Sequence, residues 1–391
     1  MIPSLPIRPD ISQERIHVLF VIDQLCESGG AERMLLNTIR LLPKERFRCS
    51  LVTFKIDTRI GLFQNLPCSH IVYPLRRTYD RTAVKTCFAL RNFLEREEVR
   101  IVHTFHETSD LWAGLISKIG GKRILVSSRR DMGFLRSVKH DIGYRFMNPA
   151  FDLVLTVSNK VRQFCIERDR LSPSKVKTLY NGIELAKAIN RNGGGHLRSQ
   201  MGLGPETRLI VTVGNIRAVK GIDVLVETAA IVGRHHPEAV FLVMGRNSEP
   251  QYYRQLEERM VQLGIQDKVR FLGESENVLS VLPHCDIFFL PSRSEGFSNA
   301  LIEAMACGLP CVATRVGGNT EAVEEDCSGY LIESEDHKAA ADRIQRLLNN
   351  PVSAREMGSA GRKIVENRFT AEVMIQQLVG HYEGLLAARR S

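Results

Sequence analysis

The sequence predicts an α/β protein made of two doubly wound parallel-sheet domains in tandem. Three observations support this prediction. Short apolar runs typical of buried strands alternate with stretches of 3.6-residue periodicity along most of the 391 residues. A polar, glycine-rich segment interrupts this alternation near the middle, and the alternation then restarts. The length suits two domains of ordinary size, and the hydrophobic fraction of 43% is typical of a globular protein.

The first half of the chain contains seven of the expected strands. They are the apolar runs at residues 16–22, 48–54, 70–73, 100–105, 123–128, 152–158 and 176–180. Helical patterns such as "AERMLLNTIRLL" and "SNKVRQFCIERD" lie between most of them. Because strands that alternate with helices form parallel sheets with helices on both faces, residues 1–190 are expected to form one Rossmann-like domain.

The second half repeats this pattern after the break. The segment 191–207, with three consecutive glycines, is predicted to be an interdomain linker. Further strands are expected at residues 208–215, 240–245, 269–273, 286–292, 310–316 and 328–334, and helices at residues 220–234, 251–263 and 298–307. These elements predict a second Rossmann-like domain over 208–370. Residues 371–391 are expected to form a C-terminal helix, for which packing back on the N-terminal domain is one option.

The composition indicates the cellular compartment in which such a protein is expected. No apolar run approaches the roughly 18–20 residues that span a bilayer. The first residues lack the basic and apolar regions of a secretion signal. The nine cysteines are an odd number and form no CxxC pair, which favours a reducing, cytoplasmic location. Cys307 and Cys311 flank a turn, but no second ligand pair accompanies them, so we expect no metal site.

The charge of the chain is unevenly distributed. The net charge is +9, and residues 1–190 are strongly basic, whereas residues 191–391 carry a small excess of acidic side chains. A charge that served solubility alone would not divide in this way. Nucleic-acid binding would use a basic domain, but no known binding motif or pattern of stacking aromatics accompanies it, so no nucleic-acid partner is expected.

The stretch "PSRSEGFSNALIEAMACGLPCVAT" at 291–314 places two carboxylates around a helix start. Ser298 is a good N-cap, Glu295 precedes it, and Glu303 lies about one turn inside the helix. A helix N-terminus suits phosphate, and carboxylates accept hydrogen bonds from the hydroxyls of a sugar. The stretch therefore predicts a site for a nucleoside diphosphate sugar. The alternative is that both glutamates are solvated surface charges.

The spacing of these glutamates resembles the E-x7-E signature of glycosyltransferase family 4 (glycosyl transferases group 1), the retaining, GT-B-fold nucleotide-sugar glycosyltransferases. "VTVGNIRAVKGIDVLVE", "VRFLG" and "VGGNTEAV" resemble further segments of its C-terminal domain. "ESGGAERMLLN" and "IVHTFHETSDLWAGLIS" resemble its N-terminal domain. The resemblance implies two Rossmann-like domains that face each other across a cleft, with the acceptor on the N-terminal side and the donor on the C-terminal side.

The resemblance also implies roles for residues of the glutamate motif. Glu303 would bind the nucleoside ribose, and Glu295 would bind hydroxyls of the donor sugar. The backbone of residues 297–299, which are Phe297, Ser298 and Asn299, would meet the sugar and the diphosphate.

The resemblance implies that Lys220 pairs with the diphosphate. A cation there makes chemical sense, because a fixed positive charge stabilises a leaving group that departs as an anion. The alternative is a solvated lysine at a helix start. The family has an arginine directly after the glycine of this loop, where this chain has Asn215. Arg217, two residues later, is the candidate to replace it.

In the N-terminal domain the implied site residues follow strand ends. Gly29 and Gly30 either make a tight turn or approach the donor with their backbone. Of His103 and His106, we favour His106 as the residue that faces the donor sugar; a strand-end histidine can also be a hydrogen-bonded core residue. A last group follows the next strand and either contacts acceptor or donor or forms a structural ion pair: Arg129, Arg130 and Asp131.

The implied reaction moves a hexose-type sugar from a nucleoside diphosphate to an acceptor hydroxyl with retention, in the synthesis of a cell-surface polysaccharide or glycolipid. UDP is favoured over GDP. Attack from the front face would let the leaving diphosphate oxygen take the acceptor proton. No metal and no cofactor beyond the nucleotide sugar are expected, since Lys/Arg side chains and a helix end can replace a divalent ion. A nucleotide-sugar 2-epimerase, a hydrolase or a non-catalytic nucleotide-sugar-binding subunit of the same fold are the alternatives.

A basic helix in the first half of the chain suggests a surface that contacts the acceptor. "LRRTYDRTAVKTCFALRNFL" carries five basic residues, Arg76, Arg77, Arg81, Lys85 and Arg91. Either this face is simply solvated, or it touches an anionic surface, such as an acidic glycan or a membrane that bears a lipid-linked acceptor. In the membrane case the protein would be peripheral at the inner face of the cell membrane.

Overall fold

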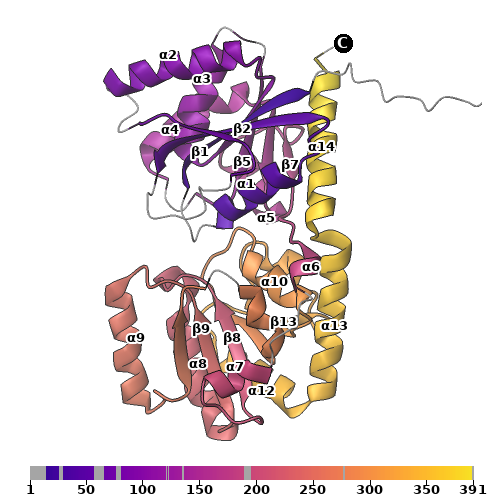
Figure 1. Ribbon diagram of the computed structural model, residues 1–391. Helices are drawn as coiled ribbons and strands as arrows, with labels where there is room; N and C mark the ends of the chain where they lie inside the picture. The colour runs from indigo at the N-terminus through magenta and orange to yellow at the C-terminus, as the bar shows by residue number, and fades with distance from the viewer. Residues whose placement is uncertain are drawn as a thin grey trace, which may run out of the picture. The chain divides into compact units, whose positions relative to one another are not determined.

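A computed structural model describes residues 15–25, 30–56, 66–75, 81–119, 121, 123–133, 136–188, 195–275 and 278–389. In these residues the strands form two sheets, and the chain divides into two compact units (Figure 1). The first unit comprises residues 1–128, 135–154 and 381–391, and the second comprises residues 129–134 and 155–380. The prediction of two parallel-sheet α/β domains is confirmed.

The first sheet has seven strands in the order β3-β2-β1-β4-β5-β6-β7, and adjacent strands from β3 to β5 are parallel. Every strand predicted for the first half is present. Their bounds are β1 Ile16–Leu25, β2 Phe47–Ile56, β3 Ser69–Val72, β4 Ile101–Phe105, β5 Ile124–Arg129, β6 Leu153–Thr156 and β7 Val176–Thr178. The central strand β1 is fully buried from Val18 to Ile22, as its unbroken apolar run predicts.

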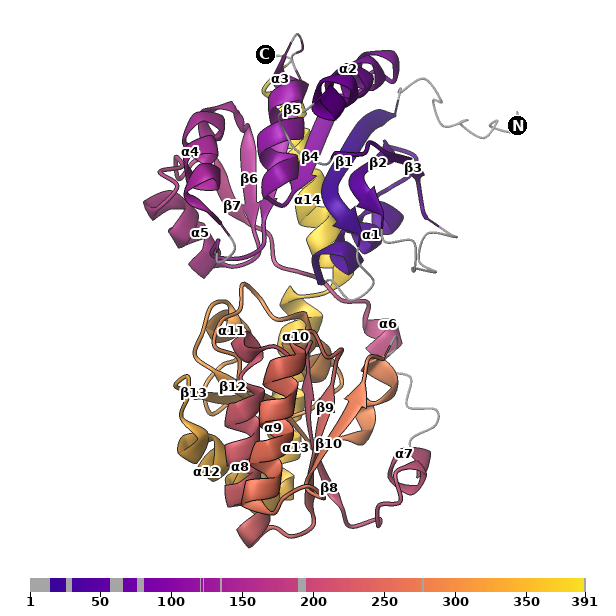
Figure 2. The same cartoon turned by 90° about the vertical axis from the view of Figure 1, so that its left-hand side faces the viewer.

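The helices between these strands range from single turns to the 16 residues of α2. They are α1 Gly30–Leu41, α2 Arg81–Arg96, the π-helical turn η2 Ser109–Ala113 with α3 Gly114–Lys118, α4 Val138–Met147, the 3-10 turn η3 Asn148–Ala150 and α5 Asn159–Glu167. Figures 1 and 2 show α2, α3 and α4 side by side on one face of the sheet. The end of α14 (Ala371–Ala387) covers the other face, where the Tyr382 ring packs 5.9 Å from the Phe47 ring.

The segment between the sheets contains two short helices, α6 Leu185–Ala188 and α7 Gly195–Gln200. The predicted linker, 191–207, therefore has helical structure at α7, while its first residues, 191–194, lie outside the described residues. Strand β7 belongs to the first sheet, although contacts group residues 155–188 with the second unit.

The second sheet has the six predicted strands, and their order in the sheet is β10-β9-β8-β11-β12-β13. The strands are β8 Arg208–Val213, β9 Ala239–Met244, β10 Val269–Gly273, β11 Ile287–Leu290, β12 Cys311–Thr314 and β13 Gly329–Ile332. The helices are α8 Ile222–His235, α9 Pro250–Leu263, α10 Asn299–Ala306, α11 Asn319–Ala322, α12 His337–Asn349 and α13 Pro351–Arg368. The strand order changes direction between β8 and β11, which is where ligands bind in sheets of this kind.

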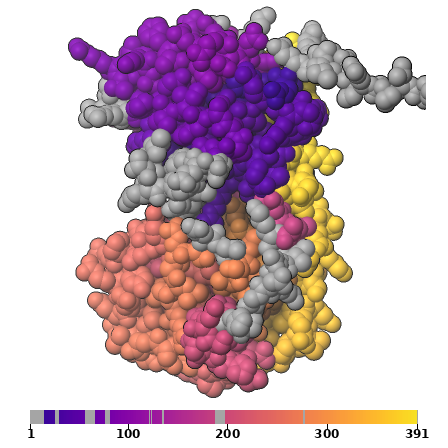
Figure 3. All heavy atoms as spheres, in the orientation of Figure 1, coloured from indigo at the N-terminus to yellow at the C-terminus, as the bar shows by residue number. Residues whose placement is uncertain are grey.

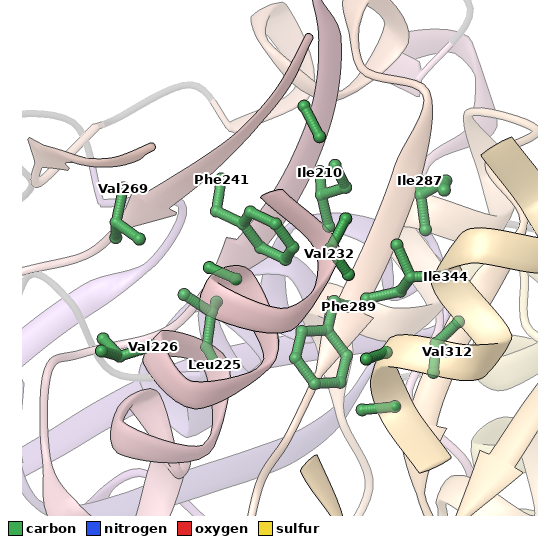
Figure 4. Close-up of a cluster of buried hydrophobic side chains, with 14 of the residues drawn as sticks. Ile210, Leu225, Val226, Val232, Phe241, Val269, Ile287, Phe289, Val312 and Ile344 are labelled. Carbon is green, nitrogen blue, oxygen red and sulfur yellow. The ribbon is translucent and has the colours of Figure 1, made fainter. Parts of the chain in front are cut away.

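The core of the second unit forms where α8 and α12 pack on this sheet. Leu225 and Val232 of α8 meet Phe241 of β9 and Phe289 of β11, and Ile344 of α12 closes the cluster (Figure 4). All five side chains are almost completely buried. This packing makes the strand ends of β8 and β11 a rigid base for the loops that follow them. No helix in the described part of the chain is long and apolar enough to cross a bilayer.

Candidate active site

The loop from Pro291 to Ser298 joins β11 to α10 at the switch point of the second sheet. Ser298 is the N-cap, and its hydroxyl oxygen accepts the Leu301 N–H at 3.3 Å. Leu301 and Met305 are buried on the inner side of the helix, whereas Glu303 is half-buried on another side. The predicted cap and helix start are therefore confirmed.

Lys220 and Glu295 are in contact, although they are 75 residues apart in the chain. Lys220 ends the 3-10 turn η4 (Ala218–Lys220) that follows β8, and its Nζ donates to Glu295 Oε1 at 2.7 Å. The Ser292 hydroxyl donates to the same oxygen at 2.6 Å. Glu295 is only 9% exposed, so its carboxylate depends on these two partners. A cation and a carboxylate thus lie beside a capped helix start at the switch point.

Two glycines allow the loops of this site to approach each other. Gly221 has φ +65°, and a Cβ there would lie 2.1 Å from the carbonyl oxygen of Pro291. Gly317 has φ +49°, and a Cβ there would lie 1.6 Å from the carbonyl oxygen of Glu295. Any other residue at either position would push the glutamate loop out of place. The "GNIRAVKG" and "VGG" segments therefore support the loop that holds Glu295.

Arg293 joins the same loops, and sequence reasoning did not single it out. Its guanidinium donates to both carboxylate oxygens of Asp223, at 2.9 and 2.6 Å, and contacts the carbonyl oxygen of Ala218. Its backbone N–H donates to the Val219 carbonyl at 2.8 Å. Burial alone would raise the pKa of Asp223, but the hydrogen bonds from Arg293 and Tyr252 outweigh it and lower that pKa. Arg293 thereby holds the turn that carries Lys220, a role that no pattern in a single sequence reveals.

Replacing Arg293 by alanine is expected to lower turnover about 10- to 100-fold, because a displacement of Lys220 by about 1 Å is costly at a reacting centre. The matched control is Arg259→Ala, which also removes a surface ion pair, that of Arg259 with Glu227 at 2.5 Å. Steady-state transfer rates and melting temperatures of both variants would be compared. Equal losses of activity in the two variants would show that Arg293 does not position the site.

Three further residues of the predicted site surround the start of α10. Phe297 is buried, and its ring packs 5.3 Å from Tyr180 and 5.2 Å from Phe369. Asn299 accepts a hydrogen bond from the Asn181 amide at 2.6 Å, and the Asn181 oxygen accepts one from Arg130 at 2.6 Å. A chain of hydrogen bonds therefore links Arg130 to the helix start within the second unit.

Arg129 and Asp131 make local contacts. Arg129 is 3% exposed and pairs with the equally buried Asp169 at 3.3 Å. Asp131 accepts the Gly133 N–H at 2.6 Å and so closes a turn. These are the contacts of a structural ion pair and a turn. A role for either residue with donor or acceptor stays a prediction.

Arg217 faces α9. Its Nε lies 3.2 Å from Glu249 Oε1, and the side chain is nearly half exposed. Glu249 also accepts the Ala218 N–H at 2.8 Å. Asn215, at the position of the family arginine, accepts the Arg246 N–H at 3.4 Å. The proposal that Arg217 supplies a second phosphate cation therefore requires it to leave Glu249.

In the first unit the predicted residues follow β1 and β4, the switch point of that sheet. Gly30 begins α1, and Gly29 lies outside the described residues. His103 is 2% exposed, and its ring nitrogens contact the Tyr382 hydroxyl at 2.6 Å and the Ser128 hydroxyl at 2.8 Å. His106 lies beyond the strand end, half-buried, with φ 71°. His103 is thus a hydrogen-bonded core residue, and His106 stays the predicted donor contact.

Because His103 is buried in the core and His106 is not, one substitution is expected to lower stability and another to lower turnover. Tyr382→Phe removes one of the two hydroxyl partners of the buried His103 and leaves the other, Ser128, so it is expected to lower the free energy of unfolding by about 1–3 kcal/mol. His106→Asn, in which asparagine tolerates the left-handed backbone, is expected to leave stability unchanged and to lower turnover. Thermal denaturation and rate assays of both variants, with Tyr73→Phe as the matched tyrosine control, would check this. A fully active His106→Asn protein would remove the role given to His106.

Comparison with known proteins explains this arrangement. The family described as "Glycosyl transferases group 1" matches residues 196–364, and "Glycosyltransferase Family 4" matches residues 28–187. N-acetyl-alpha-D-glucosaminyl L-malate synthase of Bacillus anthracis is 31% identical over 324 residues, which cover 83% of this chain and 76% of that protein. The chain belongs to glycosyltransferase family 4, the group 1 glycosyl transferases.

Other relatives of this glycosyltransferase agree. UDP-Gal:alpha-D-GlcNAc-diphosphoundecaprenol alpha-1,3-galactosyltransferase of Escherichia coli is 23% identical over 340 residues, 83% of this chain and 86% of that protein. The crystal structure of HepE of Anabaena in complex with UDP superimposes with a TM-score of 0.83 at 20% identity, over 94% of this chain and 100% of that one. The glycosyltransferase therefore has the GT-B fold and is related to transferases of polysaccharide and glycolipid synthesis.

Proposed function

We propose that this glycosyltransferase moves a hexose-type sugar from a nucleoside diphosphate to an acceptor hydroxyl with retention at the anomeric carbon. The observation that carries the proposal is the Lys220–Glu295 pair beside the capped start of α10. One group is a cation suited to a diphosphate, and the other is an acceptor suited to sugar hydroxyls. Both lie at the strand ends where a doubly wound sheet binds its ligand.

The mechanism we propose uses charge and position. Lys220 turns from Glu295 to the diphosphate and stabilises the negative charge that develops as the glycosidic C–O bond breaks. Glu295 then accepts hydrogen bonds from sugar hydroxyls, and Glu303 accepts those of the ribose. The acceptor oxygen attacks from the face that the diphosphate leaves, and a leaving phosphate oxygen takes the acceptor proton. Lys220 and the N-terminus of α10 supply the positive charge, so we propose that neither a metal nor a further cofactor takes part.

The donor we propose carries UDP rather than GDP. HepE of Anabaena crystallised with UDP and with UDP-glucose, and the Escherichia coli relative is named for UDP-Gal. In the first unit, His106 remains our proposed contact to the donor sugar.

The acceptor we propose is a glycan or a lipid-linked sugar. The name of the Escherichia coli relative includes a diphosphoundecaprenol acceptor, which is a lipid. The basic half of this chain suits an anionic acceptor or the surface that carries one. Of the five basic residues predicted for that contact, Arg81, Lys85 and Arg91 belong to α2, whereas Arg76 and Arg77 lie outside the described residues. We propose a cytoplasmic protein that binds the inner face of the cell membrane peripherally.

A ligand screen tests the donor. Purified protein would be melted with UDP, GDP, UDP-glucose, UDP-galactose, UDP-N-acetylglucosamine and GDP-mannose, each at about 100 times the dissociation constant, where a true ligand stabilises by about 2.7 kcal/mol. The stabilising donor would then be incubated with acceptor glycosides, and the anomeric configuration of the product read by NMR. Absence of stabilisation by any nucleotide would refute the proposal. Conversion of the donor without acceptor would indicate an epimerase or hydrolase, and binding without turnover would indicate a non-catalytic subunit.

A further inference from the structure

The outer surface of α2, α3 and α4 exposes apolar side chains. Among the described residues nine large hydrophobic side chains are exposed, and seven of them lie on these helices or at the end of α3. The most exposed are Phe146 at 78%, Val138 at 73% and Phe88 at 63%. Scattered exposed hydrophobics are normal, but their concentration on three neighbouring helices marks an interaction surface.

Helix α4 shows the pattern most clearly. Val138, Ile142 and Phe146 are four residues apart, so they form one stripe along the helix. Tyr144 and Met147 are buried on the opposite side, against the rest of the first unit. The helix is therefore apolar on two sides, and its core uses only one of them. Packing in the core therefore does not explain why the outer stripe is apolar.

Basic residues flank this stripe. At 100° per residue, Lys139 and Arg145 project on either side of it, and both are exposed. Long basic side chains beside an outward apolar stripe are typical of helices that lie in a membrane interface, because the stems rest on apolar surface while the charges reach the phosphate groups. The acidic residue of α4, Asp141, is half-buried.

The neighbouring helices extend the same surface. On α2, Val84 and Phe88 are exposed at the same four-residue spacing, and the exposed Arg81 and Lys85 lie beside them. The carboxylate on this part of α2, Glu95, is paired with Arg91 at 3.1 Å. Figure 2 shows α2, α3 and α4 side by side, and in Figure 3 purple atoms cover much of the visible surface of the first unit.

We propose that the outer surface of α2, α3 and α4 docks on an anionic lipid membrane, with the α4 stripe inserted between the lipid head groups. The apolar side chains fit the boundary of the acyl chains, and the basic side chains fit anionic head groups. A second copy of this chain is a poorer partner, since a symmetric contact would bring the same positive charges together. The inference rests on the proposed function, which includes peripheral binding to the cell membrane, and deepens it by naming the surface that binds.

Vesicle binding tests the proposal. The full-length protein would be sedimented with phosphatidylcholine vesicles and with vesicles that also contain phosphatidylglycerol, at low and high salt. We expect binding to the anionic vesicles that high salt weakens. Ile142→Gln/Phe146→Gln is expected to reduce the partition coefficient at least tenfold. The matched control, Val261→Gln/Val352→Gln, removes two exposed side chains of similar exposure, 60% and 58%, on α9 and α13 and should bind like the wild type.

Insertion of the α4 stripe into the membrane can be measured separately, by tryptophan fluorescence. A Phe146→Trp protein should show a blue-shifted emission on anionic vesicles and quenching by lipids with a shallow spin label, after subtraction of the wild-type signal of Trp112. Negligible binding of the wild type, or equal loss in the control variant, would overturn the proposal. So would a wild-type dimer that Ile142→Gln/Phe146→Gln converts to a monomer without any vesicle binding. The nucleotide-induced rise in melting temperature should persist in this variant; its absence in every protein would refute the proposed function and leave the membrane result standing.

Discussion

Lys220→Ala is expected to lower turnover about 10²- to 10³-fold in a protein that remains folded. The lysine ends the turn η4 that follows β8, where we place the departing diphosphate, and a fixed cation there acts most strongly while charge develops on the leaving group. Lys268→Ala is the matched control, because its side chain is 23% exposed, against 26% for Lys220, and it too has an acidic neighbour. Initial transfer rates and circular dichroism spectra would be measured for both. Wild-type turnover in the folded variant would make Lys220 a structural residue only.

A second substitution, at the Lys220 partner Glu295, distinguishes a loss of stability from a loss of catalysis. Removing the lysine takes a cation away from Glu295, which is 9% exposed and keeps the hydrogen bond from the Ser292 hydroxyl, so some loss of stability is expected as well. Replacing Glu295 by glutamine in the same protein removes the unpaired charge. The Lys220→Ala/Glu295→Gln protein should therefore regain melting temperature without regaining turnover. Recovery of both would mean that the single substitution acted through misfolding.

Glu303→Ala is expected to weaken the binding of free UDP and of the UDP-sugar alike. A hydrogen bond to a charged group contributes about 1.5–3 kcal/mol, which corresponds to roughly a 10- to 100-fold rise in Kd. Glu295→Ala should weaken the UDP-sugar more than free UDP, because its carboxylate is assigned to the sugar. Calorimetric titration of both variants with both ligands gives the comparison, with Glu366→Ala of α13 as the control. If UDP binds folded Glu303→Ala with wild-type affinity, Glu303 does not hold the ribose.

His103 and His106 show that a sequence pattern cannot distinguish a histidine of the core from a histidine of the site. Both histidines were expected at the end of the same apolar strand, and the sequence left both open while favouring His106. The partner that places His103 in the core is Tyr382, 279 residues further along the chain. No local pattern can foresee a hydrogen bond at that separation, because it depends on where the last helix packs on the first sheet.

Arg293 and the α4 stripe were missed for related reasons. Arg293 is one of two charged residues in its loop. Its role depends on Asp223 and Ala218, which only the packing of β8 beside β11 brings within reach. In α4, Val138, Ile142 and Phe146 have the spacing of a core face. Spacing predicts that apolar residues share a side of a helix, but it does not tell which side the protein covers.

The sequence by itself determined the two parallel sheets, the order of their strands along the chain, the cap at Ser298 and the pair of glutamates around it. These depend on local properties: strand and helix periodicity, capping chemistry and the spacing of a motif. The tertiary structure decided which polar residues meet, as Lys220 meets Glu295, and which apolar side chains stay outside the core, as Phe146 does. The physical reason is that contacts and burial are set by distances between segments far apart in the chain, and these distances exist only once the sheets have formed and the helices have packed on them.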